Sequence, residues 1–257
     1  MRRGVDGALN PPSNNLNGAQ LDWDFARRKP DKYFEYWATR NTSFIPETYY
    51  QHPRLCLEIG AGSGAFFTEL ARLYPERFHL ALERCRHRAA RLVRKTARAG
   101  LPNLAGIRGN AIPALLHGIP AGVVERIYIL YPCPFPKTSQ RKHRWYAHPV
   151  MPHLLRILKP GGLLIWASDQ KFYIDEAAFV CAGRWGLETL RHGVISANEW
   201  NDLASFPGGR TKFERQFLGL GLDCYELIVK KAHGSRPEPV EPATTGVASE
   251  LPGRTVV

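Results

Sequence analysis

The chain has 257 residues and 44% of them are hydrophobic, so it can bury a sizeable core and is not expected to be disordered throughout. Lysine and arginine number 35 against 23 aspartates and glutamates, and the net charge of +12 attracts polyanions. The five cysteines form no Cys-x-x-Cys pair, and no apolar run approaches about 18 residues, which argues against a disulfide framework, a zinc site and a membrane span.

Both ends of the chain are predicted to be tails that flank one domain. Residues 1–20 are rich in Gly, Asn and Pro, and residues 234–257 are Pro-rich and nearly free of aromatic side chains. The block between them, residues 21–233, contains no internal repeat and predicts a single domain. Because no secretory signal is visible, we expect the protein to be cytoplasmic.

Strand-like and helix-like segments alternate through this block. Short apolar runs predict strands, and apolar positions three and four residues apart predict helices. The order is strand 55–59, helix 65–74, strand 78–83, helix 84–99, a weaker strand 104–108, and strands 126–131 and 163–168, with extended segments 187–195 and 222–230. This alternation predicts a doubly wound α/β fold with a mostly parallel, seven-stranded sheet and an antiparallel edge. Ligands of such sheets bind at the carboxyl ends of the strands.

A glycine-rich turn follows the first predicted strand. Gly60, Gly62 and Gly64 let the backbone turn sharply and let a ligand approach its N–H groups closely. Glu83, at the end of the second strand, could accept hydrogen bonds from both hydroxyls of a ribose. These features fit a dinucleotide-binding site, a methyltransferase site or a tight turn without a ligand.

Two further features separate these alternatives. The segment 158–163 (LKPGGL) leads into the fifth strand and resembles the same junction in class I methyltransferases. Glu58 precedes the glycine-rich turn, where a carboxylate can face the cationic methionine part of S-adenosylmethionine but would disfavour a pyrophosphate. The methyltransferase interpretation is therefore favoured over the dinucleotide one.

Three less common strings sharpen the match. They are 131–137 (YPCPFPK) after the fourth strand, 167–169 (ASD) at the end of the fifth, and 210–215 (RTKFER) before the last. With the two turns, they resemble the bacterial type of the tRNA (guanine-N7)-methyltransferase family, in consistent order from about residue 54 to residue 230. The resemblance implies S-adenosylmethionine as cofactor and tRNA as partner, without a metal or a membrane, in a monomer or homodimer.

The resemblance also implies roles for individual residues. The cofactor would contact Glu58, Gly60, Gly62, Gly64, Glu83, Asn110 and Ala111. The guanine and its tRNA would lie near Lys137, Asp169, Thr211, Lys212, Phe213 and Glu214. The catalytic candidates are Cys133, Asp169 and Glu214. From the residues alone, Phe213 could instead be an ordinary core aromatic, and Lys212 a solvated charge at a strand edge.

The sequence departs from the family at three of these positions. Cys133 and Phe135 stand where the family has Asp and Trp, and Asn110 stands where it has Asp. An asparagine amide can still hydrogen-bond an adenine edge, so we expect cofactor binding to persist. The Asp that Cys133 replaces is held to be central to activity in the family, and a thiol is mostly neutral at pH 7.

Methylation at guanine N7 can tolerate this loss because N7 is a lone pair with no proton to remove. The rate of an in-line displacement depends mainly on orientation, which can contribute roughly 7–11 kcal/mol. Asp169 and Glu214 could still stabilise the cation that develops on the purine and select guanine through its N1–H and N2–H. Three hypotheses follow: an active tRNA methyltransferase, which we favour, a non-catalytic or altered-substrate tRNA-binding paralogue, and a small-molecule methyltransferase.

Basic residues gather in two places besides the weaker stretch 27–29. The predicted helix 84–99 carries Arg84, Arg88, Arg91, Arg94, Lys95 and Arg98 on one face, with Ala89, Ala90, Val93 and Ala97 elsewhere to pack. That face could bind RNA or be a solvated surface. The second cluster adjoins the proline-rich loop and consists of Lys137, Arg141, Lys142, His143 and Arg144, followed by Trp145 and Tyr146. Positive charge with neighbouring aromatic side chains suits RNA phosphates and unstacked bases. Because this cluster adjoins the proposed active loop, we expect it to be the better RNA site.

Overall fold

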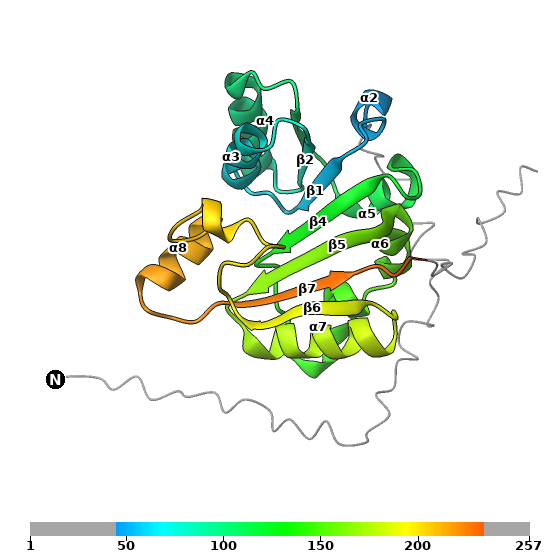
Figure 1. Cartoon of the computed structure of the whole chain (residues 1–257), viewed down its shortest axis with the longest axis vertical. Helices are drawn as coiled ribbons and strands as arrows, with labels where there is room; N and C mark the ends of the chain where they lie inside the picture. The colour runs from blue at the N-terminus through cyan, green and yellow to red at the C-terminus, as the bar shows by residue number, and fades with distance from the viewer. Residues whose placement is uncertain (1–44, 234–257) are drawn as a thin grey trace, which may run out of the picture.

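The computed structural model describes residues 45–233 as one α/β unit (Figure 1). Its strands are β1 (Leu55–Ile59), β2 (Phe78–Glu83), β3 (Leu104–Arg108), β4 (Val124–Leu130), β5 (Leu158–Ser168), β6 (Glu188–Val194) and β7 (Tyr225–Lys230). They form a seven-stranded sheet in the order β3-β2-β1-β4-β5-β7-β6, in which only the pairs of β7 with β5 and β6 are antiparallel. The fold class predicted from the sequence is confirmed. The predicted tails and the basic stretch 27–29 lie outside the described residues.

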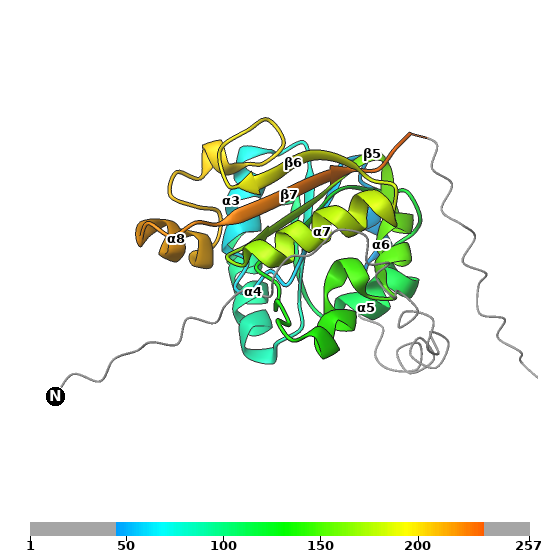
Figure 2. The same cartoon turned by 90° about the horizontal axis from the view of Figure 1, so that it is seen from below.

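Helices and single turns cover both faces of the sheet. The α-helices are α2 (Glu47–Tyr50), α3 (Ala65–Leu73), α4 (Arg86–Ala99), α5 (Ala111–Pro113), α6 (Met151–Ile157), α7 (Lys171–Gly183) and α8 (Lys212–Gly219). Shorter helical turns of other types are η2 (Ala114–Gly118), η3 (Thr138–His143), η4 (Trp145–Ala147) and η5 (Leu203–Ser205). Figure 2 shows α7 running along β7 on one side of the sheet. None of the helices in the described part of the chain combines the length and apolar character that crossing a membrane requires.

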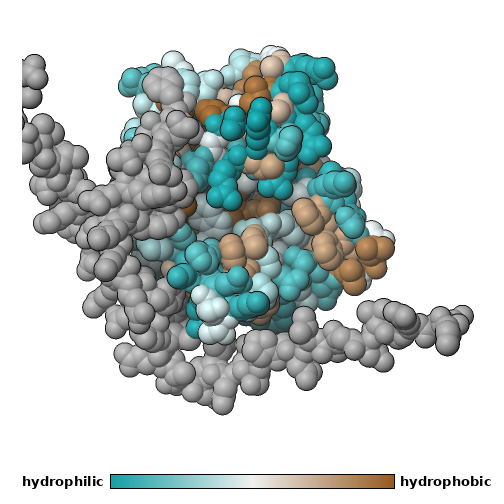
Figure 3. Space-filling view, turned by 180° about the vertical axis from the view of Figure 1, so that it is seen from behind, coloured by the Kyte–Doolittle hydropathy of each residue, from teal (hydrophilic) through white to brown (hydrophobic). Residues whose placement is uncertain are grey.

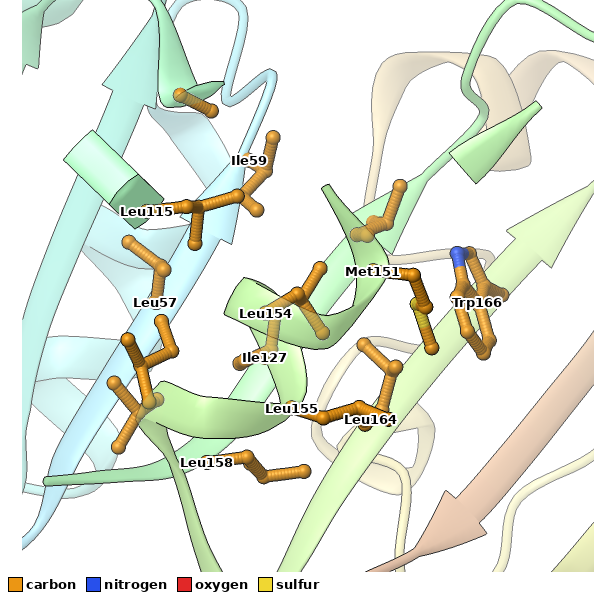
Figure 4. Packing of buried hydrophobic residues seen from close by; sticks show 14 of the residues in the cluster. Leu57, Ile59, Leu115, Ile127, Met151, Leu154, Leu155, Leu158, Leu164 and Trp166 are labelled. Atoms are coloured by element: carbon orange, nitrogen blue, oxygen red, sulfur yellow. The ribbon is translucent and has the colours of Figure 1, made fainter. Parts of the chain in front are cut away.

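Successive side chains of a strand point to opposite faces of the sheet, so the strands contribute to a hydrophobic core on each face. Leu57 of β1 packs with α6 and η2 on one face, whereas its neighbour Cys56 packs with α3 on the other. Figure 4 shows the first core, in which Leu154 of α6 lies beside Ile127 of β4 and Leu57 belongs to the same cluster. Each fully buried side chain of this kind contributes about 1.5–3 kcal/mol. The two cores hold the sheet rigid, so that its carboxyl edge is a fixed platform.

Three details of the predicted elements were wrong. The KPGG turn is part of β5 rather than a loop before it, because the Gly161 N–H bonds the carbonyl of Lys231 and the Lys231 N–H bonds that of Gly162. Helix α4 buries Ala89, Leu92 and Thr96, and leaves the remaining predicted packing residues, Ala90, Val93 and Ala97, exposed. Segment 212–219 is helix α8, and the extended segment 222–230 shortens to β7.

Candidate active site

A cavity of about 840 Å³ opens at the carboxyl ends of β1, β2 and β4. The strand order reverses between β1 and β4, and doubly wound sheets bind their ligands at such a reversal. The volume is in the range that small-molecule sites use. The predicted site residues that line the cavity are Glu58, Gly60, Gly62, Glu83, Asn110, Ala111, Cys133, Thr211, Lys212 and Phe213.

The glycine-rich turn forms one wall of the cavity. Gly62 has a φ of 59°, in the left-handed region that favours glycine, and a Cβ there would meet no other atom within 4 Å. Its N–H donates to Oε2 of Glu83 at 2.9 Å, while Oε1 of Glu83 accepts from the N–H of Cys85 at 2.7 Å. The turn is therefore fastened to the end of β2 with open space beside it.

Glu58 is the last residue but one of β1, just before the glycine-rich turn. One oxygen of its buried carboxyl group has no hydrogen-bond partner among the described residues. Its side chain is 4% exposed, and Oε2 has no hydrogen-bond partner among the described residues. Burial, with a smaller contribution from Glu83, raises the pKa of Glu58 to about 8. Since buried polar atoms are nearly always satisfied, this oxygen is suited to a cationic or hydrogen-bond-donating ligand group.

Asn110 begins the short helix α5 and offers a donor to the cavity. Its Oδ1 accepts from the N–H of Ile112 at 3.1 Å, which fixes the orientation of the amide. Its Nδ2 is buried and has no partner within the described chain. The amide can therefore donate to a ring nitrogen of a bound ligand, as the sequence predicted for an adenine edge.

The loop after β4 places Cys133 at the cavity, and the backbone of this loop is unusual on both sides of Cys133. Tyr131 and Phe135 on either side of Cys133 have φ values of 53° and 45°, which residues other than glycine rarely adopt. Such conformations persist where the surroundings enforce them and are frequent at functional sites. The surrounding group here is Arg144, which is 3% exposed and donates to the carbonyl oxygen of Phe135 from Nη2 at 2.8 Å.

The start of α8 forms the opposite wall. Thr211 caps this helix by accepting the N–H of Glu214 at Oγ1, at 3.1 Å. Phe213 is 58% exposed, so it is not a core aromatic, and its ring stacks on that of Tyr131 with centroids 6.0 Å apart. An exposed aromatic ring at the mouth of a cavity is suited to stacking on a nucleobase. Lys212 lies on this helix rather than at a strand edge.

Glu214 lies behind this wall in a buried ion pair. Arg210, Glu214 and Glu226 are all fully buried. Arg210 donates from Nη2 to Oε1 of Glu214 at 2.8 Å and from Nη1 to Oε2 of Glu226 at 2.9 Å. The backbone N–H of Arg210 also donates to Oε2 of Glu214 at 2.6 Å. Both oxygens of Glu214 are engaged, so its carboxylate is not oriented for contact with a substrate.

Four of the predicted site residues do not line the cavity: Gly64, Lys137, Asp169 and Glu214. Gly64 serves packing instead, because a Cβ there would come within 2.3 Å of Cδ1 of Leu92 on α4. Lys137 is exposed on the loop after β4. Asp169 is half-buried at the end of β5 and accepts a hydrogen bond from the side chain of Gln170.

Two of the five members of the second basic cluster are paired with one carboxylate of α7, which weakens the expectation that this cluster is the better RNA site. Glu176 of α7 forms ion pairs with Arg141 at 2.8 Å and with Arg144 at 2.5 Å. Arg144 is also buried, so it holds the loop rather than a phosphate. In the described part of the chain, the members of the cluster that stay exposed and form no ion pair with a carboxylate are Lys137, Lys142 and His143.

Sequence reasoning missed several residues at the site. The cavity is also lined by Phe66 of α3 and by Trp145 and His148 near η4. The apolar spacing of segment 65–74 predicts that Phe66 packs inward but not that it reaches the cavity, and Trp145 was expected to face RNA. His148 follows an irregular turn, which carries no periodicity. The start of helix α8, in contrast, could be recognised in the sequence, because Thr211-x-x-Glu214 is a capping-box motif, which marks the beginning of a helix.

Comparisons with known proteins identify the family. A family model described as "Putative methyltransferase" matches residues 52–227. The tRNA (guanine-N(7)-)-methyltransferase of Burkholderia cenocepacia is 32% identical over 181 residues, covering 70% of this chain and 67% of the relative. The chain belongs to the tRNA (guanine-N7)-methyltransferase family. The similarly named protein of Lacticaseibacillus casei is 26% identical over 205 residues, covering 80% of this chain and 90% of the relative.

Solved structures agree on the fold of this methyltransferase. The 16S rRNA methyltransferase KamB matches with a TM-score of 0.53 and 19% identity, over 76% of this chain and 97% of that chain. A 16S rRNA (adenine(1408)-N(1))-methyltransferase from Catenulisporales acidiphilia matches with a TM-score of 0.50 and 16% identity, over 76% and 95%. At these identities the likeness concerns the fold alone.

Membership in this family makes S-adenosylmethionine the cofactor, and the cavity fits it. The unpartnered carboxylate oxygen of Glu58 suits the cationic methionine part, and the free Nδ2 of Asn110 suits a ring nitrogen of adenine. Glu83 lies at the end of β2 beside the turn of Gly62, where a ribose would be expected. When bound, the cofactor supplies a methyl group activated on a sulfonium.

Proposed function

We propose that this methyltransferase transfers the methyl group of S-adenosylmethionine to N7 of a guanine in tRNA. The observation that carries the proposal is that one cavity joins the Glu58 carboxylate to the loop of Cys133 and to the start of α8. The first belongs to the cofactor end, and the other two belong to strings that mark the tRNA-modifying family. The names of the matched relatives, which act on tRNA guanine, support the same assignment.

The chain's own residues would act mainly by orientation. Guanine N7 attacks as a lone pair, so no general base is required, and holding it in line with the methyl group can contribute roughly 7–11 kcal/mol. Phe213 would stack on the base, and Thr211 and Lys212 would contact the nucleotide from the same wall. Because Cys133 stands where the family has Asp and Asp169 does not line the cavity, alignment rather than a carboxylate beside the base would carry the reaction. Glu214 would act as a positioning residue through its ion pair with Arg210.

The relatives' names are those of enzymes, and this favours catalysis over the non-catalytic alternative. A tRNA substrate fits the cytoplasmic location predicted from the sequence. The monomer or homodimer expected from the resemblance stays a prediction that a sedimentation measurement would test.

The test is methyl transfer from labelled S-adenosylmethionine to unmodified tRNA transcripts, with nucleoside identification of the product. We expect label in 7-methylguanosine, and expect Glu58→Gln to abolish transfer. Glu69→Gln is the matched control, because Glu69 is 56% exposed on α3 and outside the cavity. If cofactor and tRNA both bind to the wild-type protein but no label is transferred, the non-catalytic alternative replaces this proposal.

A further inference from the structure

Helix α4 carries a continuous basic stripe that reaches the mouth of the cavity. We define the α4 ridge as Arg84, Arg88, Arg91, Lys95 and Arg98, which follow one another at steps of three and four residues. All five are exposed, and the first three line the cavity. Residues 86–98 span about 18 Å of helix, the rise of about five nucleotide steps in one strand of a duplex. Figure 3 shows hydrophilic side chains over the part of this face that α3 and α4 form.

The charge of this ridge is almost uncompensated in the described part of the chain. Among the described residues, Glu83 is the carboxylate that pairs with the ridge, and its Oε1 lies 3.4 Å from Nη2 of Arg88. Helix α4 itself contains no acidic residue, so its like charges repel one another. The loop cluster differs, because Arg141 and Arg144 share the carboxylate of Glu176 and Arg144 is buried. The ridge is therefore the stronger attractor for a polyanion.

Basic side chains also stand on the other side of the cavity mouth. Lys212 and Arg215 of α8 line the cavity opposite Arg84, Arg88 and Arg91. A strand entering between them would present its phosphates to cations on both sides while a base enters the cavity. Phosphate contacts of this kind fix the register and orientation of a nucleic acid without reading its sequence.

We propose that the α4 ridge binds the phosphate backbone of the tRNA next to the target guanine and thereby sets the orientation in which the tRNA docks. This inference rests on the proposed function, since it requires an RNA nucleotide in the cavity. In this arrangement, Arg144 of the loop cluster holds the catalytic loop and does not contact RNA.

The experiment compares two triple variants with equal loss of charge. Arg91→Gln/Lys95→Gln/Arg98→Gln removes the three ridge residues toward the end of α4, of which Arg91 alone lines the cavity. Lys159→Gln/Arg184→Gln/Lys230→Gln is the control, because these residues lie at the amino edge of the parallel strands, away from the cavity. Binding of an unmodified tRNA transcript is measured with S-adenosylhomocysteine present, between about 50 and 200 mM salt.

Each lost phosphate contact should lower the slope of log K against log salt by about 0.7–0.9. We therefore expect the ridge variant to lose about 2–3 from that slope and the control variant to keep the wild-type slope. Equal slopes and affinities for the two variants would overturn the proposal. Because this assay involves no methyl transfer, a ridge-dependent slope in a protein that transfers no methyl would uphold the ridge and reject the proposed function.

Discussion

Replacing Arg210 with methionine should destabilise the protein more than most single substitutions. The side chain is fully buried, and it is the cation shared by the carboxylates of Glu214 and Glu226. Although burial lowers the pKa of Arg210, the two carboxylates raise it above its usual value, so the arginine stays charged. Methionine fills a similar length but leaves both buried carboxylates without their cation.

Removing one partner of a buried ion pair costs about 3–5 kcal/mol. Glu226 keeps its hydrogen bond from Nδ2 of Asn201 at 2.7 Å, and Glu214 keeps that from the backbone N–H of residue 210 at 2.6 Å. These remaining bonds keep the expected loss within that range even though two carboxylates are affected. For a domain of this size, each kcal/mol shifts Tm by about 2–4 °C, so we expect Tm to fall by about 6–20 °C.

The assay is a thermal or urea melt of Arg210→Met beside Arg98→Met. Arg98 is exposed on α4, so its replacement should change stability by no more than about 0.5 kcal/mol. A triple variant that adds Glu214→Gln and Glu226→Gln removes the orphaned charges while keeping acceptor oxygens, and should recover much of the loss. If Arg210→Met costs under about 1 kcal/mol, or if the triple variant is less stable still, the account of this network as an ion pair is wrong.

Three further predictions concern the cavity. Burial raises the pKa of Glu58 to about 8 and so favours its protonated form. The stability of the free protein should therefore fall as pH rises from about 5 to about 8. Melts of Glu58→Gln across that range should not show this dependence. Cys133→Asp should raise kcat/KM for tRNA about tenfold, because a carboxylate about 4 Å from a developing cation contributes about 1–4 kcal/mol. Cys133→Ser should not raise kcat/KM. Unchanged turnover in the aspartate variant would refute the electrostatic argument. Gly64→Ala should lower the free energy of unfolding by about 2–5 kcal/mol, because φ is left-handed there and the added Cβ clashes with Leu92. Gly100 also has a positive φ but faces open space, so Gly100→Ala should cost about 1–2 kcal/mol. Equal losses would mean that the clash with Leu92 relaxes freely.

The strands and the cofactor end could be predicted because their signals are local. Apolar runs define the strands, Glu58 comes just before the glycine-rich turn, and Glu83 ends the next strand. Since the carboxyl ends of parallel strands meet at one edge, these residues had to lie close together once the topology was known. The structure adds that Gly64 faces Leu92 rather than the cavity, which depends on how closely α3 approaches α4.

The substrate end could not be predicted in the same way, because buried ion pairs decide which of its charged side chains reach the cavity. Glu176 of α7 removes Arg144 from the exposed basic surface, and Arg210 removes Glu214 from the cavity. Arg144 and Glu176 are 32 residues apart, so their pairing leaves no pattern in the sequence, whereas Arg210 and Glu214 are four residues apart and only their burial could not be foreseen. A charged residue near a site motif therefore indicates a ligand only after the charges that fold against it are known.

The same pairings explain how the site can accommodate a cysteine at position 133. The backbone of this loop is held from behind by the guanidinium of Arg144 on the carbonyl of Phe135, not by the side chain of Cys133, which is exposed. The other wall is likewise held from behind, by Arg210. The change to cysteine therefore removes a charge at the reacting centre but leaves the devices that orient it. For a reaction whose nucleophile is a lone pair and whose rate depends mainly on alignment, losing that charge should slow turnover without abolishing it.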